Sequence, residues 1–128
     1  MNLLVDTQIA LWWLSNDERL SSRSRDLISS AETAAYFSVG SLWEIAIKNG
    51  QGRLEANATM VARWLKEWAV EILPIALPHL AVLEQLPPHH RDPFDRLILA
   101  QALSEGMRVL TSDDKMTIYG VPCISATR

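Results

Sequence analysis

The sequence predicts a three-layer α/β/α sandwich with a central, mostly parallel sheet. Short β-like runs alternate with helical patterns along the chain, and strands joined through helices form right-handed crossovers and parallel sheets. The first run, Leu3-Leu4-Val5, is apolar at every position, which is typical of a strand covered on both faces. Residues 1–128 are expected to form a single domain, because domain lengths cluster around ~100–150 residues.

The first half of the chain is predicted to contain two strands and three helices. Asp6 or Thr7 can cap the first helix, Ser21 or Ser22 can cap the second, and Asn49-Gly50 is expected to end the third. The predicted elements are, in order, the strand 3–5, the helix 7–14, a helix that runs through Ile28, the strand 35–39 and the helix 41–48.

The second half contains the clearest helix of the sequence, over residues 92–105. Asp92 occupies the N-cap position, Pro93 the first helical position, and Gly106 follows the last turn. The other predicted elements are a helix over 60–68, a strand over 71–75, a short helix over 79–86, a strand over 108–111 and a weak strand over 122–125.

Composition indicates an intracellular globular protein. Hydrophobic residues make up 48% of the chain, which is too many for a disordered protein, and the net charge of −3 argues against a protein that coats nucleic acid. The single cysteine, Cys123, cannot form an internal disulfide, which favours a reducing compartment. We find no signal peptide, and no apolar run approaches the ~20 residues of a membrane span. A cytoplasmic protein without membrane contact is therefore expected.

Acidic residues lie at the carboxyl ends of two of the predicted strands. Asp6 directly follows the first strand, and the segment Ser112-Asp113-Asp114 follows the strand Arg-Val-Leu-Thr. Ligands of open α/β sheets bind beyond the carboxyl ends of the strands. Each position also has a purely structural explanation, because Asp6 can cap the next helix and an Asp-Asp pair is common in turns. Adjacent turn residues point in different directions, so one of Asp113 and Asp114 is expected to face the site.

A third carboxylate, Glu44, lies on the predicted helix 41–48. Two structural roles are open to it, because it could complete a capping box with Ser41 or pair with Lys48 one turn later. Its neighbours on this helix are nevertheless almost all apolar. A helix that is apolar nearly all round is buried, and its only carboxylate is then expected to have a specific partner.

A fourth carboxylate, Asp95, lies in the first turn of the helix 92–105. It could simply stabilise the helix macrodipole. It also shares one helical stripe with Leu99 and Ala102, which indicates that it faces a buried partner or a cation. Asp92, three residues earlier, is better explained as the N-cap.

These four carboxylates are expected to converge on one edge of the sheet. Carboxylates that lie close together repel one another and raise one another's pKa, so the arrangement is favourable only around divalent cations. Oxygen ligands without His or Cys select Mg²⁺ or Mn²⁺ over zinc. One or two such ions could activate a water molecule and stabilise the leaving oxygen during phosphodiester hydrolysis.

Other side chains give weaker indications. Arg96 is expected to be a counter-charge for the acidic cluster or a contact for phosphate. His89 and His90 lack the spacing of zinc ligands and are expected to lie in a solvated loop. Trp12 and Trp13 are adjacent on one predicted helix, so at least one is expected to lie outside the core, in an interface. This favours a homodimer.

Four segments of the chain, in order, resemble a known family. They are LLVDTQIALWWL, SVGSLWEIAIKNGQGRL, HHRDPFDRLILAQAL and VLTSDDKMTIYG. Together they are similar to the PIN-domain family, specifically the VapC-like toxins of bacterial type II toxin–antitoxin pairs, and the resemblance spans nearly the whole chain. It implies a three-layer sandwich, Mg²⁺- or Mn²⁺-dependent endoribonuclease activity, a homodimer, and inhibition by a cognate antitoxin protein. With the four convergent carboxylates, we expect metal-dependent cleavage of single-stranded RNA.

The resemblance also assigns roles to individual residues. It places Asp6, Glu44, Asp95 and Asp113 at the family's four catalytic, metal-binding carboxylates, with Asp114 as the alternative at the most variable fourth position. Ser41 and Thr111 occupy polar positions that support the site. We expect Thr7, Arg96 and Asp114 to support the site or to contact RNA.

Two other classes of protein remain as alternatives. A receiver-like phosphoacceptor domain needs an acidic pair beside the first strand, an aspartate after the third and a lysine after the fifth. Here Asp6 stands alone, the third predicted strand ends at prolines, and no lysine follows the last one. A non-catalytic PIN-like interaction module would not need all four carboxylates, and its function would survive the loss of metal binding.

Overall fold

A computed structural model of residues 1–128 contains a five-stranded sheet in which every neighbouring pair of strands is parallel. The strand order is β3-β2-β1-β4-β5. The strands are β1 (Asn2–Val5), β2 (Ala34–Ser38), β3 (Glu71–Leu73), β4 (Arg108–Thr111) and β5 (Cys123–Ser125). Strand β1 is central, and the chain continues to one side of it with β2 and to the other with β4. The carboxyl end of β1 is therefore the topological switch point, where such sheets bind ligands.

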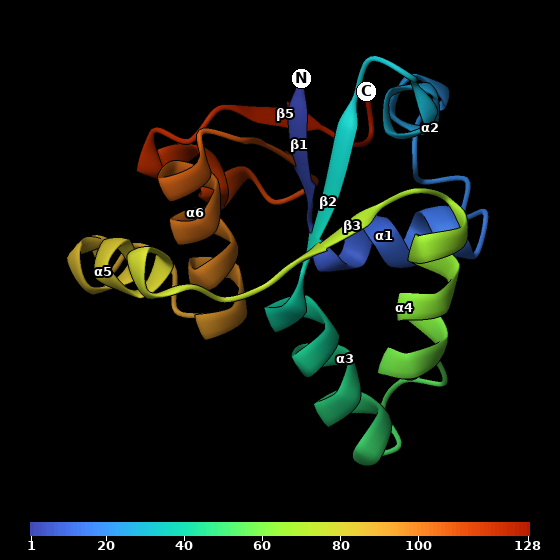
Figure 1. Cartoon of the computed structure of the whole chain (residues 1–128), viewed down its shortest axis with the longest axis horizontal. Coiled ribbons are helices and arrows are strands. Elements are labelled where there is room, and N and C mark those ends of the chain that lie inside the picture. The colour runs from blue at the N-terminus through green and yellow to red at the C-terminus, as the bar shows by residue number, and fades with distance from the viewer.

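Helices cover both faces of this sheet (Figure 1). They are α1 (Thr7–Leu14), α2 (Ser22–Ser29), α3 (Val39–Gly50), α4 (Ala58–Glu67), α5 (Leu77–Gln85) and α6 (Pro93–Glu105), with a 3₁₀ helix η1 (Asp114–Tyr119). Leu3 and Val5 of β1 pack in one hydrophobic cluster with residues of α1, α2, α3 and α4. Leu4 belongs to a second cluster with residues of α6 and η1. Successive side chains of β1 thus point to opposite faces of the sheet and contribute to two separate cores. The predicted three-layer architecture is confirmed. No helix combines the length and the apolar character needed to cross a membrane.

The helix that carries Glu44 is longer than predicted at both ends. Its N-cap is Ser38, whose hydroxyl accepts the N–H of Gly40 at 3.0 Å. Ser41 therefore lies inside the helix and does not form the capping box that its spacing to Glu44 suggested. The expected stop at Asn49-Gly50 comes too early, because the helix includes both residues and ends at Gly50, with Gln51 as its C-cap. The left-handed turn comes later, at Gly52 with a φ of 72°.

The start of α6 agrees with the sequence prediction. The Oδ1 atom of Asp92 accepts the N–H groups of Phe94 (2.8 Å) and Asp95 (3.2 Å), and Gly106 is left-handed with a φ of 69°. Strand β3 stops earlier than predicted, at Leu73, because Pro74 has no N–H to continue the ladder. The 3₁₀ helix after β4 was not predicted.

Candidate active site

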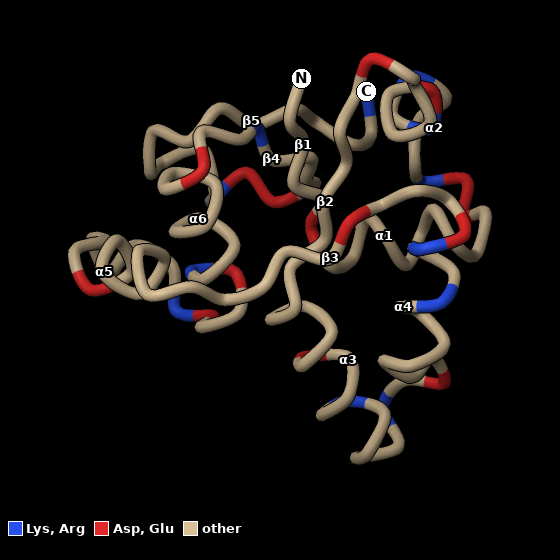
Figure 2. The backbone as a smooth tube through the Cα atoms, viewed as in Figure 1, with Lys and Arg blue, Asp and Glu red and all other residues tan.

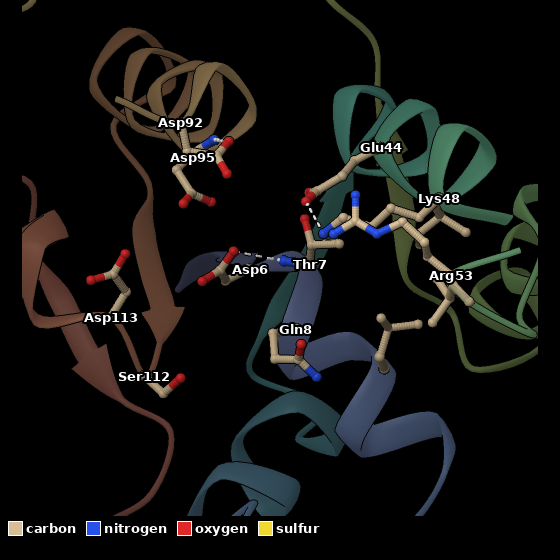
Figure 3. Close-up of a pocket in the computed structure, with 13 residues that line it drawn as sticks. Asp6, Thr7, Gln8, Glu44, Lys48, Arg53, Asp92, Asp95, Ser112 and Asp113 are labelled. Atoms are coloured by element: carbon tan, nitrogen blue, oxygen red, sulfur yellow. Dashed lines mark hydrogen bonds and ion pairs between the residues drawn. The ribbon is translucent and has the colours of Figure 1, made fainter. Parts of the chain in front are cut away.

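Four acidic side chains from four different elements line one cavity of about 430 Å³ at the carboxyl edge of the sheet. Asp6 follows β1, Asp113 follows β4, Glu44 belongs to α3, and Asp95 lies in the first turn of α6. Figure 3 shows Asp6, Asp95 and Asp113 pointing toward a common space, with Glu44 on the other side of Thr7. The structure thus brings together the four carboxylates that the sequence analysis singled out.

Asp6 is both a helix cap and the buried centre of this cluster. Its Oδ1 accepts the N–H of Thr7 at 2.8 Å, and its Oδ2 accepts the hydroxyl of Thr111 at 2.7 Å. The residue is only 7% exposed. Burial raises the pKa of Asp6, the two hydrogen bonds oppose that rise, and the nearby charges of Asp113 and Glu44 add to it. The capping role therefore accompanies a position at the site and does not replace it.

Three buried hydroxyl groups support the acidic cluster. The Oγ1 atom of Thr111 donates to Asp6 and also accepts the N–H of Asp113 at 3.0 Å. The Oγ1 atom of Thr7 donates to the Oγ of Ser41 at 2.7 Å, which ties the start of α1 to α3. Each of these hydroxyls was expected near the site, and each lies in or directly behind it.

A glycine sets how closely α3 approaches α6. A Cβ atom at Gly40 would lie 2.4 Å from Cδ2 of Leu97, so only glycine allows this contact without a shift of the leucine. The close approach brings the helix that carries Glu44 up to the helix that carries Asp95.

The site also changes the protonation of Asp95. Its pKa is raised to about 7, first by burial and then by the negative charges of Asp6 and Asp92, against the opposing effect of His90. An unprotonated Asp95 is therefore unfavourable unless a cation enters the cluster. Asp92 lines the same cavity but is occupied as the N-cap of α6, as predicted.

His90 belongs to the acidic cluster, although the sequence analysis expected this histidine to lie in a solvated loop. Its side chain is only 11% exposed, and its Nε2 lies 2.8 Å from Oδ2 of Asp113 and 3.2 Å from Oδ2 of Asp95. Its Nδ1 accepts the N–H of Asp92 at 3.1 Å, so the proton of the neutral ring is on Nε2 and is donated to the carboxylates. The usable signal was its position two residues before a helix cap, where a ring nitrogen can accept a free backbone N–H.

The structure distinguishes between the two aspartates that follow β4. Asp113 lines the cavity, whereas Asp114 is exposed at the start of η1 and lies outside it. Partial burial acts to raise the pKa of Asp113, but the hydrogen bonds from His90 and from the N–H of Lys115 outweigh it, and the pKa is lowered. Asp113 is therefore the aspartate that faces the other carboxylates.

The two oxygens of Glu44 have different surroundings. Oε2 forms an ion pair with Nζ of Lys48 at 2.8 Å, the i,i+4 pair that the sequence allowed. Oε1 is buried and has no hydrogen-bond partner. A buried carboxylate oxygen without a partner is costly, which indicates a place for a ligand at this end of the cavity.

Arg96 does not reach the cluster, contrary to the expectation from sequence. Its guanidinium donates to the carbonyl oxygens of Leu86 and Pro87 and to the hydroxyl of Tyr119. It lies in the first turn of α6 but points to the segment that precedes this helix. Arg96 therefore holds the 86–87 segment and η1 against α6, and it is neither a counter-charge nor an available phosphate contact.

Comparisons with known proteins agree with this fold. A model of the family described as "PIN domain" matches residues 3–121. Ribonuclease VapC22 of Mycobacterium tuberculosis is 30% identical over 123 residues, which cover 94% of this chain and 93% of that protein. Among solved structures, VapBC2 from Rickettsia felis bound to a promoter DNA fragment aligns with a TM-score of 0.77 at 15% identity, over 97% of this chain and 98% of that one. VapBC-1 from nontypeable Haemophilus influenzae aligns with a TM-score of 0.70 at 18% identity, over the whole of both chains. The chain therefore belongs to the PIN-domain family.

Proposed function

We propose that this protein is a metal-dependent endoribonuclease that hydrolyses phosphodiester bonds of single-stranded RNA. The observation that carries the proposal is the convergence of Asp6, Glu44, Asp95 and Asp113 on one open cavity. The curated relative that matches almost the full length of the chain is named a ribonuclease. Residues 1–128 would act as one nuclease domain.

The donor groups in the cavity fit a hard divalent cation, Mg²⁺ or Mn²⁺. Asp95 and Asp113 each place a carboxylate oxygen within 4.8 Å of the other and of Nε2 of His90, and Oε1 of Glu44 is buried without a partner. Because His90 donates its Nε2–H to these carboxylates, the ligand atoms would all be oxygens. Asp6, Glu44, Asp95 and Asp113 would hold the metal. When bound, the metal would supply an activated water and neutralise charge on the leaving oxygen.

The chain's own contribution is to fix the carboxylates before the substrate arrives. Thr111 holds one oxygen of Asp6 and the backbone of Asp113 at the same time, so the carboxyl ends of β1 and β4 keep a set spacing. The Nε2–H of His90 holds Asp113 beside Asp95. Hydrogen bonds of this kind to ligand carboxylates typically contribute ten- to hundredfold in metal affinity or activity.

The direct test is cleavage of a labelled single-stranded RNA by the purified protein. Asp6→Asn keeps the shape of the side chain but removes a charge, so it should abolish cleavage and leave the circular dichroism spectrum unchanged. EDTA should stop the wild-type reaction, and added Mg²⁺ or Mn²⁺ should restore it. Cleavage that persisted undiminished in EDTA would refute the metal-dependent mechanism.

Metal binding can be tested separately from activity, by thermal unfolding. An ion that binds only the folded state raises the melting temperature by mass action. Asp6→Asn and Asp95→Asn should each reduce the rise produced by Mg²⁺. Asp92→Asn should retain it, because asparagine caps a helix as well as aspartate does. Equal losses for Asp92→Asn and Asp95→Asn would mean that the third ligand is assigned wrongly.

We further propose that the protein is the toxin of a type II pair and binds a small antitoxin. Structural relatives come from VapBC complexes, and a groove extends from the acidic cavity over the surface. The acidic cavity shares Gln8, Leu11 and Leu54 with a more apolar hollow, which in turn shares Leu14 and Trp64 with a third hollow. The groove therefore runs from the carboxylates along α1 and α4.

An antitoxin segment could lay apolar side chains in this groove and place a cation on the carboxylates. Trp13 and Trp68 pack edge to face at the end of the groove that is farther from the carboxylates, and Trp68 is 62% exposed. Co-expression with the product of the adjacent reading frame should give a complex that no longer cleaves RNA. The proposal fails if no complex forms and cleavage is unaffected.

We also propose a homodimer. Trp12 is buried and Trp13 only partly so. Trp43 on α3 is 59% exposed and packs edge to face on Phe94, with the two ring centroids 5.1 Å apart. Exposed aromatic side chains of this size are enriched at interfaces. Light scattering of the isolated chain should give twice the monomer mass, and a clean monomer at high concentration would refute the dimer.

A further inference from the structure

The cavity that holds the acidic cluster also has a basic wall. Lys48, near the end of α3, and Arg53, in the loop that follows, line the same cavity as Asp6 and Asp95. Figure 3 shows both cations beside Glu44, across Thr7 from Asp6 and Asp113. Figure 2 shows the corresponding basic segments at the end of α3 that is farther from the sheet. The two cations therefore lie across one opening from Asp6, Asp95 and Asp113, on the same side as Glu44.

Arg53 is the cation of this cavity whose charge is not already paired. Lys48 is engaged with Oε2 of Glu44, and no carboxylate lies within ion-pair distance of Arg53. The only side-chain hydrogen bond of the Arg53 guanidinium goes to Oε1 of Gln51, at 3.4 Å. A guanidinium with one weak, uncharged partner is free to bind an anion in a two-pronged geometry.

The loop after α3 is built so that it returns Arg53 to the cavity. The left-handed Gly52 reverses the chain, and the N–H of Arg53 then donates to the carbonyl of Lys48 at 2.9 Å. The side-chain amide of Asn49 donates to the carbonyls of Leu54 and Glu55 at 3.0 and 3.2 Å. The backbone on both sides of Arg53 is therefore tied to the end of α3.

We propose that Arg53 binds the backbone phosphate next to the one that is cleaved, and so sets how the RNA strand crosses the acidic cluster. This inference rests on the proposed function. Four carboxylates repel a polyanion, and a metal at the cluster attracts only the phosphate that it contacts. The Arg53 guanidinium, carried by backbone that is tied to the end of α3, would hold the neighbouring phosphate from the opposite wall, and the two contacts would together give the strand its direction and register.

The test compares charge removal at Arg53 with the same change at Arg63, which is exposed on α4 and lies outside the cavity. Binding of a fluorescein-labelled single-stranded oligoribonucleotide is followed by fluorescence anisotropy on the cleavage-deficient Asp6→Asn background, so that it does not depend on catalysis. Arg53→Gln should weaken binding about tenfold, the loss typical of one charge-assisted contact. It should also reduce the slope of log Kd against log salt by about 0.7, the value for one phosphate of a single strand. Arg53→Lys should recover part of the affinity.

In the active protein, Arg53→Gln should raise KM for the same RNA, whereas Arg63→Gln should leave both binding and cleavage as in the wild type. Equal effects of the two glutamine variants on Kd and on the salt slope would overturn the role of Arg53. That result would not contradict the proposed ribonuclease activity. Arg53-dependent binding without any cleavage by the wild-type protein would support this inference and overturn the proposed activity. Wild-type protein that bound no RNA would overturn both.

Discussion

Replacing Asp95 by asparagine should stabilise the metal-free protein at pH 8, although it removes a residue proposed to hold the metal. Asp95 lies between the charges of Asp6 and Asp92 and is partly buried, and its pKa is raised from 3.8 to about 7. Between pH 3.8 and about 7, the folded state therefore holds a proton on this carboxyl group that the unfolded chain has already released. Stability that depends on this proton is fully present below pH 3.8 and is lost as the pH rises to about 7.

The size of this effect follows from the difference between the two pKa values. Each pKa unit corresponds to ~1.36 kcal/mol, so a rise of about three units sets an upper limit of about 4 kcal/mol. The side chain of Asp95 is 21% exposed, and solvent screening reduces this limit. Asp95→Asn also loses the favourable interaction of the carboxylate with the dipole of α6, which lowers the expected gain in stability by a further ~0.3–1 kcal/mol. We therefore expect Asp95→Asn to be more stable than the wild type by about 1–3 kcal/mol at pH 8.

The assay is urea unfolding of both proteins in EDTA at pH 4.5 and pH 8. The advantage of Asp95→Asn should be small at the lower pH and should grow as the pH rises, because only the wild type gives up the proton. Added Mg²⁺ should then stabilise the wild type more than the variant and reduce or reverse the difference. A difference in stability that did not change between pH 4.5 and pH 8 would refute this account of the cluster.

Three further substitutions test how the site is built. Thr111→Val keeps the side-chain shape but removes the hydroxyl that links Asp6 to Asp113, so Mg²⁺ affinity measured by calorimetry should fall ten- to hundredfold; an unchanged affinity would contradict the linking role. His90→Ala should lower the stability of the metal-free protein at pH 8 by about 1–3 kcal/mol, and His90→Gln, which can still donate to Asp113, should lower it less in the same urea assay. Equal losses would show that the Nε2–H donor is not what matters. Gly40→Ala should cost about 1–3 kcal/mol in urea unfolding through the clash with Leu97, and a neutral result would mean that the leucine moves freely.

The sequence was sufficient for the parts of this protein that depend on local chemistry. The apolar run before Asp6 predicted a central strand, and the sheet indeed has β1 in its middle. Asp92, Pro93 and Gly106 determined both ends of α6, since capping and a left-handed stop are properties of a few consecutive residues. Because the carboxyl ends of parallel strands meet at one edge, the position of Asp6 after one strand and of the Asp113-Asp114 pair after another was enough to place them near each other, but the choice of Asp113 over Asp114 came from the structure.

The tertiary structure decided what each polar side chain faces. Ser41 had the spacing of a capping box with Glu44, but the N-cap is Ser38, three residues earlier. Ser41 instead accepts a hydrogen bond from Thr7, 34 residues away in the chain. Arg96 turns toward Tyr119 and the carbonyls before α6, whereas His90 turns inward to Asp113. Spacing along the chain determines which residues share a helical face, but the rotation of that helix and the partners opposite it come from packing between distant segments. For the same reason, the place of Arg53 in the cavity became apparent only once the loop after α3 was seen to fold back over that helix's end.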